Sequence, residues 1–430
     1  MRNWVAVVAV CITGCQQETL MAPDPPAMRM AHGSMTVVAP SAPSTLAEPS
    51  ADASGKRLGR VERAGRQQHA DGLRTAQKAL SGARIREVHG KDFDVVLDET
   101  ARRGLPKVKD AVIGLAKHIL DEAGAQALRA SDEDLSVTLR EGFSEAGFTI
   151  APDQGIGGLV AISAMHPVGH PQRLAVSFSV EFGRGGDDVL CVFEKVGADL
   201  RAVLVRRIDG YDSISGARWA SVWAIAPPAA DGSWFVVDAH SHAWISSLWR
   251  GISYAIVEPG TDANQPKLSL KGSDDAYLGE DEIASVTATA TTATIGYGSW
   301  DRLGGEHTRS YRRSFTRDAS GSFTRSAPFV YSPRELIHEL LEGDEALARL
   351  MALPGAGDKV AALHKKLRSA KDTATGTFSF KDQPDVEVQD LKSPVTVVFD
   401  CTGCTQWPKH IELVAEQSGG SWMIRSVSHR

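Results

Sequence analysis

The chain has 430 residues, which is enough for two or three domains, and 42% of them are hydrophobic and 23% charged. This composition is ordinary for a globular protein and excludes a chain that is disordered throughout. The formal net charge of −6 gives no general attraction to nucleic acid, so we expect no nucleic-acid partner.

The N-terminus has the layout of an export signal. Arg2 precedes the apolar run Trp4–Val10, and no further charge occurs before Cys15. A transmembrane anchor is the alternative, but the run is too short, because crossing a bilayer takes roughly 20 apolar residues. We therefore interpret residues 1–14 as a signal peptide.

The residues Ile12-Thr13-Gly14-Cys15 resemble the lipobox of bacterial lipoproteins. The resemblance covers residues 1–16 and implies that Cys15 is acylated, with chains such as palmitate, and becomes the first residue of the mature protein. Gln16, which is not acidic, resembles an outer-membrane address. We expect an exported protein that is lipid-anchored in the cell envelope, in the outer membrane facing the periplasm or the exterior.

Residues 15–55 are rich in Pro, Ala, Ser and Met without a periodic apolar pattern, which predicts a disordered tether. Residues 56–150 are predicted to be a helical region. Pro106 is expected at a helix start, ahead of an apolar stripe at helical spacing. Ser131 before Asp132-Glu133-Asp134 is typical of an N-cap with an acidic first turn.

From 151 to 332 the pattern changes to short alternating runs separated by Gly, Asp, Asn and Pro, which predicts an antiparallel β-rich domain. The phrase Asp231-Gly232-Ser233-Trp234 returns in similar form at 319–323 and 419–422. Each copy is expected to form a tight turn before an aromatic strand. Because the spacing is irregular, we interpret the copies as hairpins and not as a counted repeat.

Residues 333–430 are predicted to start with helices, from Pro333 to about 369, and to end in β strands. The expected fold class is α+β: a helical N-terminal region followed by an antiparallel β-rich body, with a helical insertion near 333–369. The layout of residues 170–430 resembles exported bacterial proteins of unassigned activity, and this resemblance implies no reaction.

The sharpest candidate for chemistry is a strand that ends in His-x-His. Asp238, His240 and His242 close an apolar run, and alternate residues of a strand point the same way, so both imidazoles can reach one ion. The run resembles the first metal-binding strand of amidohydrolase-type hydrolases, which implies zinc at these three residues. The segment that follows lacks the interleaved helices of that family. The alternative is a pair of histidines at a hairpin end.

The cysteines suggest a second candidate site. Cys401 and Cys404 are separated by two residues, and in an oxidising compartment we expect a disulfide between them. Zinc binding with His410, or redox activity, remains the alternative. Cys191 lies in the apolar run 189–193 and is predicted to be a small core residue.

Five of the nine tryptophans lie between 219 and 249. If exposed, Trp219, Trp244 and Trp249 can stack on sugar rings or line a partner groove. If buried, the group is the core of the β domain, and Trp219 and Trp223 share a strand face by period-two counting. Five arginines alternate with aromatic residues further along the chain: Arg309, Arg312, Arg313, Arg317 and Arg325. We interpret this run either as an anion site or as the solvated face of a strand.

We therefore expect a lipid-anchored envelope protein that acts as a non-catalytic binding or interaction module. The membrane is contacted through the lipid anchor, the partners are envelope proteins or polysaccharide, and no cofactor is required. The alternative function is a metal-dependent hydrolase that uses Asp238, His240 and His242 with zinc. A third interpretation, a structural spacer, predicts neither a ligand nor a metal.

Overall fold

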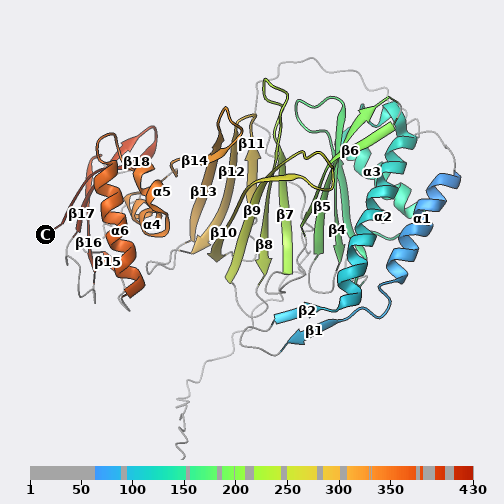
Figure 1. Ribbon diagram of the computed structural model, residues 1–430, viewed down its shortest axis with the longest axis horizontal. Coiled ribbons are helices and arrows are strands. Elements are labelled where there is room, and N and C mark those ends of the chain that lie inside the picture. Colours follow the sequence, from blue (N-terminus) through green and yellow to red (C-terminus); the bar gives the residue numbers. More distant parts are fainter. Residues whose placement is uncertain are drawn as a thin grey trace, which may run out of the picture. The chain divides into compact units, whose positions relative to one another are not determined.

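The computed structural model (Figure 1) describes residues 63–88, 94–151, 155–181, 186–197, 199–208, 217–243, 249–277, 284–300, 308–328, 330, 332–373, 378–380, 393–401 and 411–429. All of the described elements belong to one compact unit, residues 37–430. None of the helices in these ranges is both long enough and apolar enough to cross a membrane. Several predictions fall outside the described residues: those for the signal peptide, Cys15, the tether, Trp244 and Cys404, and for the side chains of Trp219, His242, Trp249 and Cys401.

Helices and one β-hairpin precede the first large sheet. They are α1 (Arg63–Lys78), β1 (Ile85–Val88), β2 (Asp94–Leu97), α2 (Glu99–Ala123), the short 3-10 helix η1 (Gly124–Gln126) and α3 (Asp132–Glu145). The N-cap of α3 is confirmed, since the Ser131 hydroxyl accepts a hydrogen bond of 3.1 Å from the Asp134 amide. The β1–β2 hairpin was not predicted, because strands of four residues are too short for their alternation to stand out.

The prediction that Pro106 starts a helix is wrong. Helix α2 begins at Glu99, where the Asp98 carboxylate caps the helix by accepting a 2.8 Å hydrogen bond from the Ala101 amide. Pro106 lies inside the helix, where it cannot donate to the carbonyl four residues before it. The cap and the buried stripe that includes Leu105 and Val108 stabilise the helix across this missing bond.

The remaining strands form four sheets of the same plan, in which four consecutive antiparallel strands pair in chain order. Sheet 1 contains β3 (Leu159–Met165), β4 (Arg173–Glu181), β5 (Gly186–Val196) and β6 (Asp199–Ile208). Sheet 2 contains β7 (Ala217–Ile225), β8 (Val236–Ala243), β9 (Trp249–Glu258) and β10 (Lys267–Tyr277). Sheet 3 contains β11 (Ser285–Ala288), β12 (Thr292–Trp300), β13 (Thr308–Arg317) and β14 (Phe323–Arg325).

Sheet 4 contains β15 (Phe378–Phe380), β16 (Val395–Cys401), β17 (Ile411–Ser418) and β18 (Ser421–His429). It follows α4 (Pro333–Glu342), α5 (Glu345–Leu350) and α6 (Gly357–Thr373), which confirms the helical insertion and the α+β fold class. The repeated turn phrases mark hairpins as predicted, with Gly232, Gly321 and Gly420 at positive φ. These hairpins group into a recurring four-stranded unit that the phrase spacing does not reveal.

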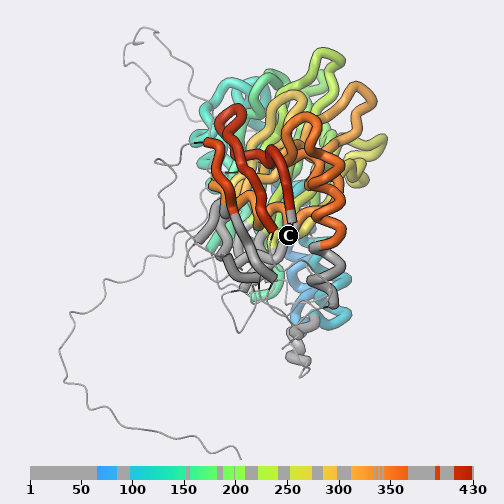
Figure 2. Tube along the Cα trace, turned by 90° about the vertical axis from the view of Figure 1, so that its left-hand side faces the viewer, coloured from blue at the N-terminus to red at the C-terminus, as the bar shows by residue number. Residues whose placement is uncertain are grey.

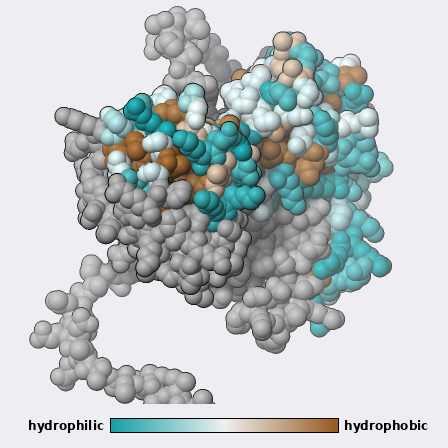
Figure 3. All heavy atoms as spheres, turned by 60° about the vertical axis from the view of Figure 1, so that its left-hand side comes forward, coloured by the Kyte–Doolittle hydropathy of each residue, from teal (hydrophilic) through white to brown (hydrophobic). Residues whose placement is uncertain are grey.

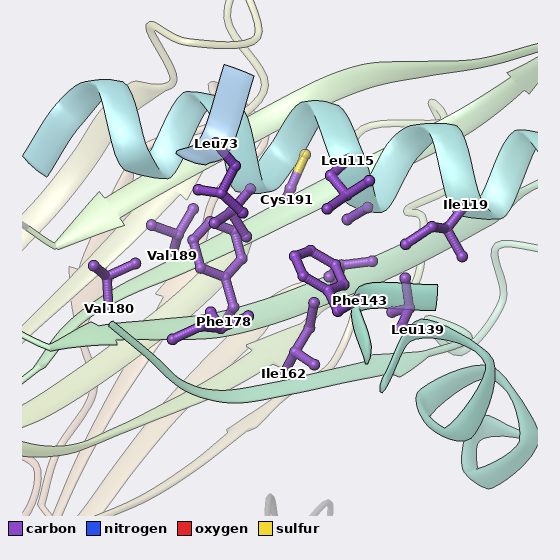
Figure 4. Close-up of a cluster of buried hydrophobic side chains, with 14 of the residues drawn as sticks. Leu73, Leu115, Ile119, Leu139, Phe143, Ile162, Phe178, Val180, Val189 and Cys191 are labelled. Atoms are coloured by element: carbon purple, nitrogen blue, oxygen red, sulfur yellow. The ribbon is translucent and has the colours of Figure 1, made fainter. Parts of the chain in front are cut away.

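Sheet 1 is covered on one face by helices α1–α3. Leu115 and Ile119 of α2 and Phe143 of α3 pack against Phe178 and other side chains of sheet 1 (Figure 4). Cys191 belongs to this core with 1% exposure, which confirms its prediction as a small core residue.

The opposite face of sheet 1 packs against sheet 2 through Leu190, Leu204, Trp223, Trp234 and Val236. The other face of sheet 2 packs against sheet 3, with Val237 and Ile256 contacting the cluster that holds Ile295. Sheet 4 and α4–α6 share a separate core around Trp422, and Figure 2 shows α6 beside the strands of this sheet.

Candidate functional site

Asp238 lies on the face of β8 that packs against sheet 1. Its strand partners are Trp223 on β7 and Ala255 on β9. The carboxylate is fully buried and accepts from Arg206 of β6, with 2.7 Å between Nε and Oδ2 and 3.3 Å between Nη2 and Oδ1. The residue therefore joins sheet 2 to sheet 1 by an ion pair.

His240 lies two residues further along the same strand face and is 6% exposed. Its Nδ1 is 3.6 Å from Oδ1 of Asp238. Burial of the Asp238 carboxyl raises its pKa, but the interaction with His240 and the charge of Arg206 outweigh this, and the pKa lies below the usual range. The group is thus an ionised carboxylate that accepts hydrogen bonds from Arg206 and lies near the imidazole of His240.

The described part of the predicted zinc site consists of the Asp238 carboxylate, both of whose oxygens bond the Arg206 guanidinium, and the nearby imidazole of His240. Within the described residues, no group of three or more His, Cys, Asp and Glu is placed to hold a metal. The structure brings Asp238 and His240 together, and the side chain of His242 is outside the described residues.

Two of the clustered tryptophans are core residues. Trp223 is 7% exposed and Trp234 is 4% exposed, and the Arg173 guanidinium stacks over the Trp234 ring at 4.7 Å. The pairing of β7 with β8 shifts between Arg218 and Ser221, and the side chain of Trp219 lies outside the described residues, so its expected face shared with Trp223 stays a prediction. The binding role of Trp219, Trp244 and Trp249 and the Cys401–Cys404 disulfide stay predictions.

The predicted arginine strand is largely neutralised by carboxylates. Arg313 is 5% exposed and bonds Glu339 of α4 at 2.6 Å, and Arg325 lies 3.7 Å from the same carboxylate. Arg317 lies 3.4 Å from Glu258 of sheet 2. These three side chains connect β13 and β14 to their surroundings, which leaves no basis for an anion site built on them. Of the others, Arg312 is exposed and the side chain of Arg309 lies outside the described residues.

The other face of sheet 3 carries a regular array of hydroxyl groups. Inward-facing residues such as Ile295 and Phe315 alternate with hydroxyl residues on all four strands. We call this surface the hydroxyl face; its residues are Ser285, Thr287, Thr292, Thr294, Ser314, Thr316, Thr324 and Ser326, all exposed or half-buried. Gly296 and Arg312 occupy the remaining described positions between them.

The strand register places the hydroxyls in rows across the sheet. Thr294 of β12 is opposite both Thr287 of β11 and Ser314 of β13, and Thr316 of β13 is opposite both Thr292 and Thr324. Rows are separated by about 6.8 Å along the strands and by about 4.8 Å between strands. Thr294 and Ser314 bond each other at 3.1 Å, which fixes their rotamers. The result is a lattice of hydroxyl donors and acceptors in which, among the described residues, Arg312 is the one charged side chain.

Sequence reasoning missed this surface, although its signal is visible. Thr and Ser recur with period two from 285 to 294 and again around 314–326. The preference of Thr for strands explains single threonines. It does not explain a surface whose described residues include neither Lys nor Glu. Sheet 4 offers the contrast, because the face of β17 opposite its core carries Glu412 and Glu416. The register, which groups the hydroxyls, is not readable from the sequence.

Comparison with known proteins finds no match to this chain. No protein-family model, curated protein or solved structure matches this chain.

Proposed function

We propose that this chain is a lipid-anchored protein of the cell envelope that binds polysaccharide without catalysis, using the hydroxyl face of sheet 3. The observation that carries this proposal is the four-strand array of Ser and Thr side chains. The lipobox-like residues before Cys15 support the envelope location.

The chemistry of the array fits a polymer of sugars. Each protein hydroxyl can donate one hydrogen bond and accept two, so a residue such as Thr294 that bonds its neighbour keeps capacity for a ligand. Sugar hydroxyls have the same dual character. A lattice with repeated rows also suits an extended ligand that makes many weak, equivalent contacts.

A protein partner fits this surface less well. Protein interfaces concentrate their binding energy in Trp, Tyr and Arg anchors, and among the side chains that the structure describes, the hydroxyl face has only Arg312 of these types. Among the described residues, the exposed large hydrophobic side chains lie on other elements; they are Val137, Val168, Val196, Leu268 and Leu350. Figure 3 shows one face of the chain, on which hydrophilic and hydrophobic residues lie side by side.

The test is sedimentation of the purified full chain with insoluble peptidoglycan sacculi, at low and at high salt. We expect the protein to sediment with the sacculi and to do so almost equally at both salt concentrations, because the surface carries little charge. Protein that stays in the supernatant at both salt concentrations would contradict the proposal. Binding that disappears at high salt would instead indicate a charge contact elsewhere on the chain.

A further inference from the structure

Arg312 is the one charged side chain among the described residues of the hydroxyl face. It lies on β13 and is exposed. Two other arginines of this strand have carboxylate partners: Arg313 bonds Glu339 at 2.6 Å, and Arg317 lies 3.4 Å from Glu258. Within the part of the chain that the structure describes, no carboxylate pairs with Arg312. The N–H donors of its guanidinium are therefore open to a ligand on this face.

The strand register places a position without a side chain next to Arg312. Its partner on β12 is Gly296, and Gly296 in turn pairs with Ser285 of β11. A Cβ added to Gly296 would come within 2.6 Å of the Ser285 hydroxyl oxygen. This hydroxyl donates to the Gly296 carbonyl at 3.3 Å and keeps its capacity to accept hydrogen bonds. One row of the face thus presents a hydroxyl and a guanidinium with no side chain between them.

The next row of the face is made of hydroxyl groups. Ser314 follows Arg312 on the same side of β13, and it bonds Thr294 of β12 at 3.1 Å. Asp and Glu do not occur among the described residues of the hydroxyl face, so no carboxylate on this surface competes for the guanidinium. A ligand that covers both rows meets neutral hydroxyls at most contacts and a positive charge at one.

We infer that Arg312 selects sugar polymers whose repeating units carry a carboxylate group. This inference rests on the proposed binding of polysaccharide by the hydroxyl face and names the chemical class of the polymer. A guanidinium is planar and always charged, and its N–H groups match the two oxygens of a carboxylate. Sugar hydroxyls beside the carboxylate bond Ser285 and Ser314. Because the contact is one exposed ion pair among neutral hydrogen bonds, it adds selectivity with only a weak dependence on salt.

The experiment is sedimentation of the full chain with two preparations of the same peptidoglycan sacculi. One is untreated, and in the other the carboxylates are converted into neutral amides with carbodiimide and ammonium. The control for Arg312→Gln is Arg201→Gln, which removes the same charge from an exposed position on β6. We expect the wild type and the control to bind amidated sacculi about fivefold more weakly than untreated ones. Arg312→Gln should bind both preparations as weakly as the wild type binds the amidated one.

The outcomes separate this inference from the proposed function. If the wild type sediments with neither preparation, the proposed function is wrong and the inference is wrong with it. If the wild type binds both preparations equally, polysaccharide binding stands and the selection of carboxylates is overturned. If Arg312→Gln still distinguishes the two preparations, the carboxylate is bound elsewhere on the chain, which also overturns the inference. Both arginines are exposed, so the two substitutions are expected to leave the fold intact.

Discussion

The guanidinium of Arg206 bonds the carboxylate of Asp238 at 2.7 Å, and this contact joins the first and second sheets of the β body. Asp238 is fully buried, whereas Arg206 keeps 22% side-chain exposure. The pair therefore has one desolvated and one partly solvated member. This asymmetry identifies Asp238 as the member of the pair whose loss the fold tolerates less.

Asp238→Asn is expected to lower the free energy of unfolding by about 3 kcal/mol at neutral pH, the low end for a broken buried pair because Arg206 is partly solvated. The pKa of Asp238 is lowered in the folded state, so its stabilisation is fully present above the unfolded pKa of about 3.9 and is lost as pH falls through the folded value. Urea denaturation of both proteins across pH measures this difference.

The control for that series is Asp110→Asn. Asp110 of α2 pairs with Arg207 of β6, the neighbour of Arg206, but its side chain is 59% exposed. Its replacement should change stability little at any pH. Equal losses in the two variants would show that burial does not govern the Asp238 contact.

A second prediction concerns Glu339, which faces Arg313 and Arg325. Glu339→Gln leaves two guanidinium groups beside a neutral amide in a buried place, and we expect unfolding to become easier by about 3–5 kcal/mol. Thermal and chemical denaturation followed by circular dichroism measure the change. Glu345→Gln, in an exposed helical pair with Arg349, is the matched control and should be nearly neutral. A neutral Glu339→Gln would refute the role given to this contact.

A third prediction follows from the burial of Cys191. Burial raises the pKa of its thiol, and the thiolate is the form that reacts with alkylating reagents. The peptide that contains Cys191 should therefore stay unmodified when folded protein is treated with iodoacetamide at mildly alkaline pH. It should become fully alkylated in denaturant. Alkylation of Cys191 in the folded state at the rate of a free thiol would contradict its place in the core.

A fourth prediction tests the lipid anchor. Cells grown with a palmitate analogue should label the wild-type protein, and Cys15→Ala should abolish the label, because the proposed site of acylation is this residue. The variant should also leave the membrane fraction, since acyl chains contribute about 0.8 kcal/mol per buried methylene. If the Cys15→Ala variant still carries the label, the acyl chain is attached to another residue and the prediction is wrong.

Sequence patterns predicted the α+β class, the N-cap of α3 and the helical insertion, because local periodicity and capping chemistry decide these features. Pro106 was misplaced, since proline is common at helix starts and the stabilising cap at Asp98 lies well before it. The contact of Arg206 with Asp238 could not be predicted from the sequence, because it joins strands that are far apart in the chain. The hydroxyl face required the strand register, which tertiary packing sets.

The most direct test of the central claim compares the affinity for peptidoglycan sacculi of the wild-type chain, Thr294→Val/Thr316→Val and the control Thr396→Val. Valine keeps the shape and strand preference of threonine and removes only the hydroxyl, and Thr396 is exposed on β16, outside the hydroxyl face. At about 1 kcal/mol for each lost hydrogen bond, we expect the double variant to bind roughly thirtyfold more weakly and the control to bind like the wild type. Equal binding by all three proteins would contradict the assignment of polysaccharide binding to sheet 3.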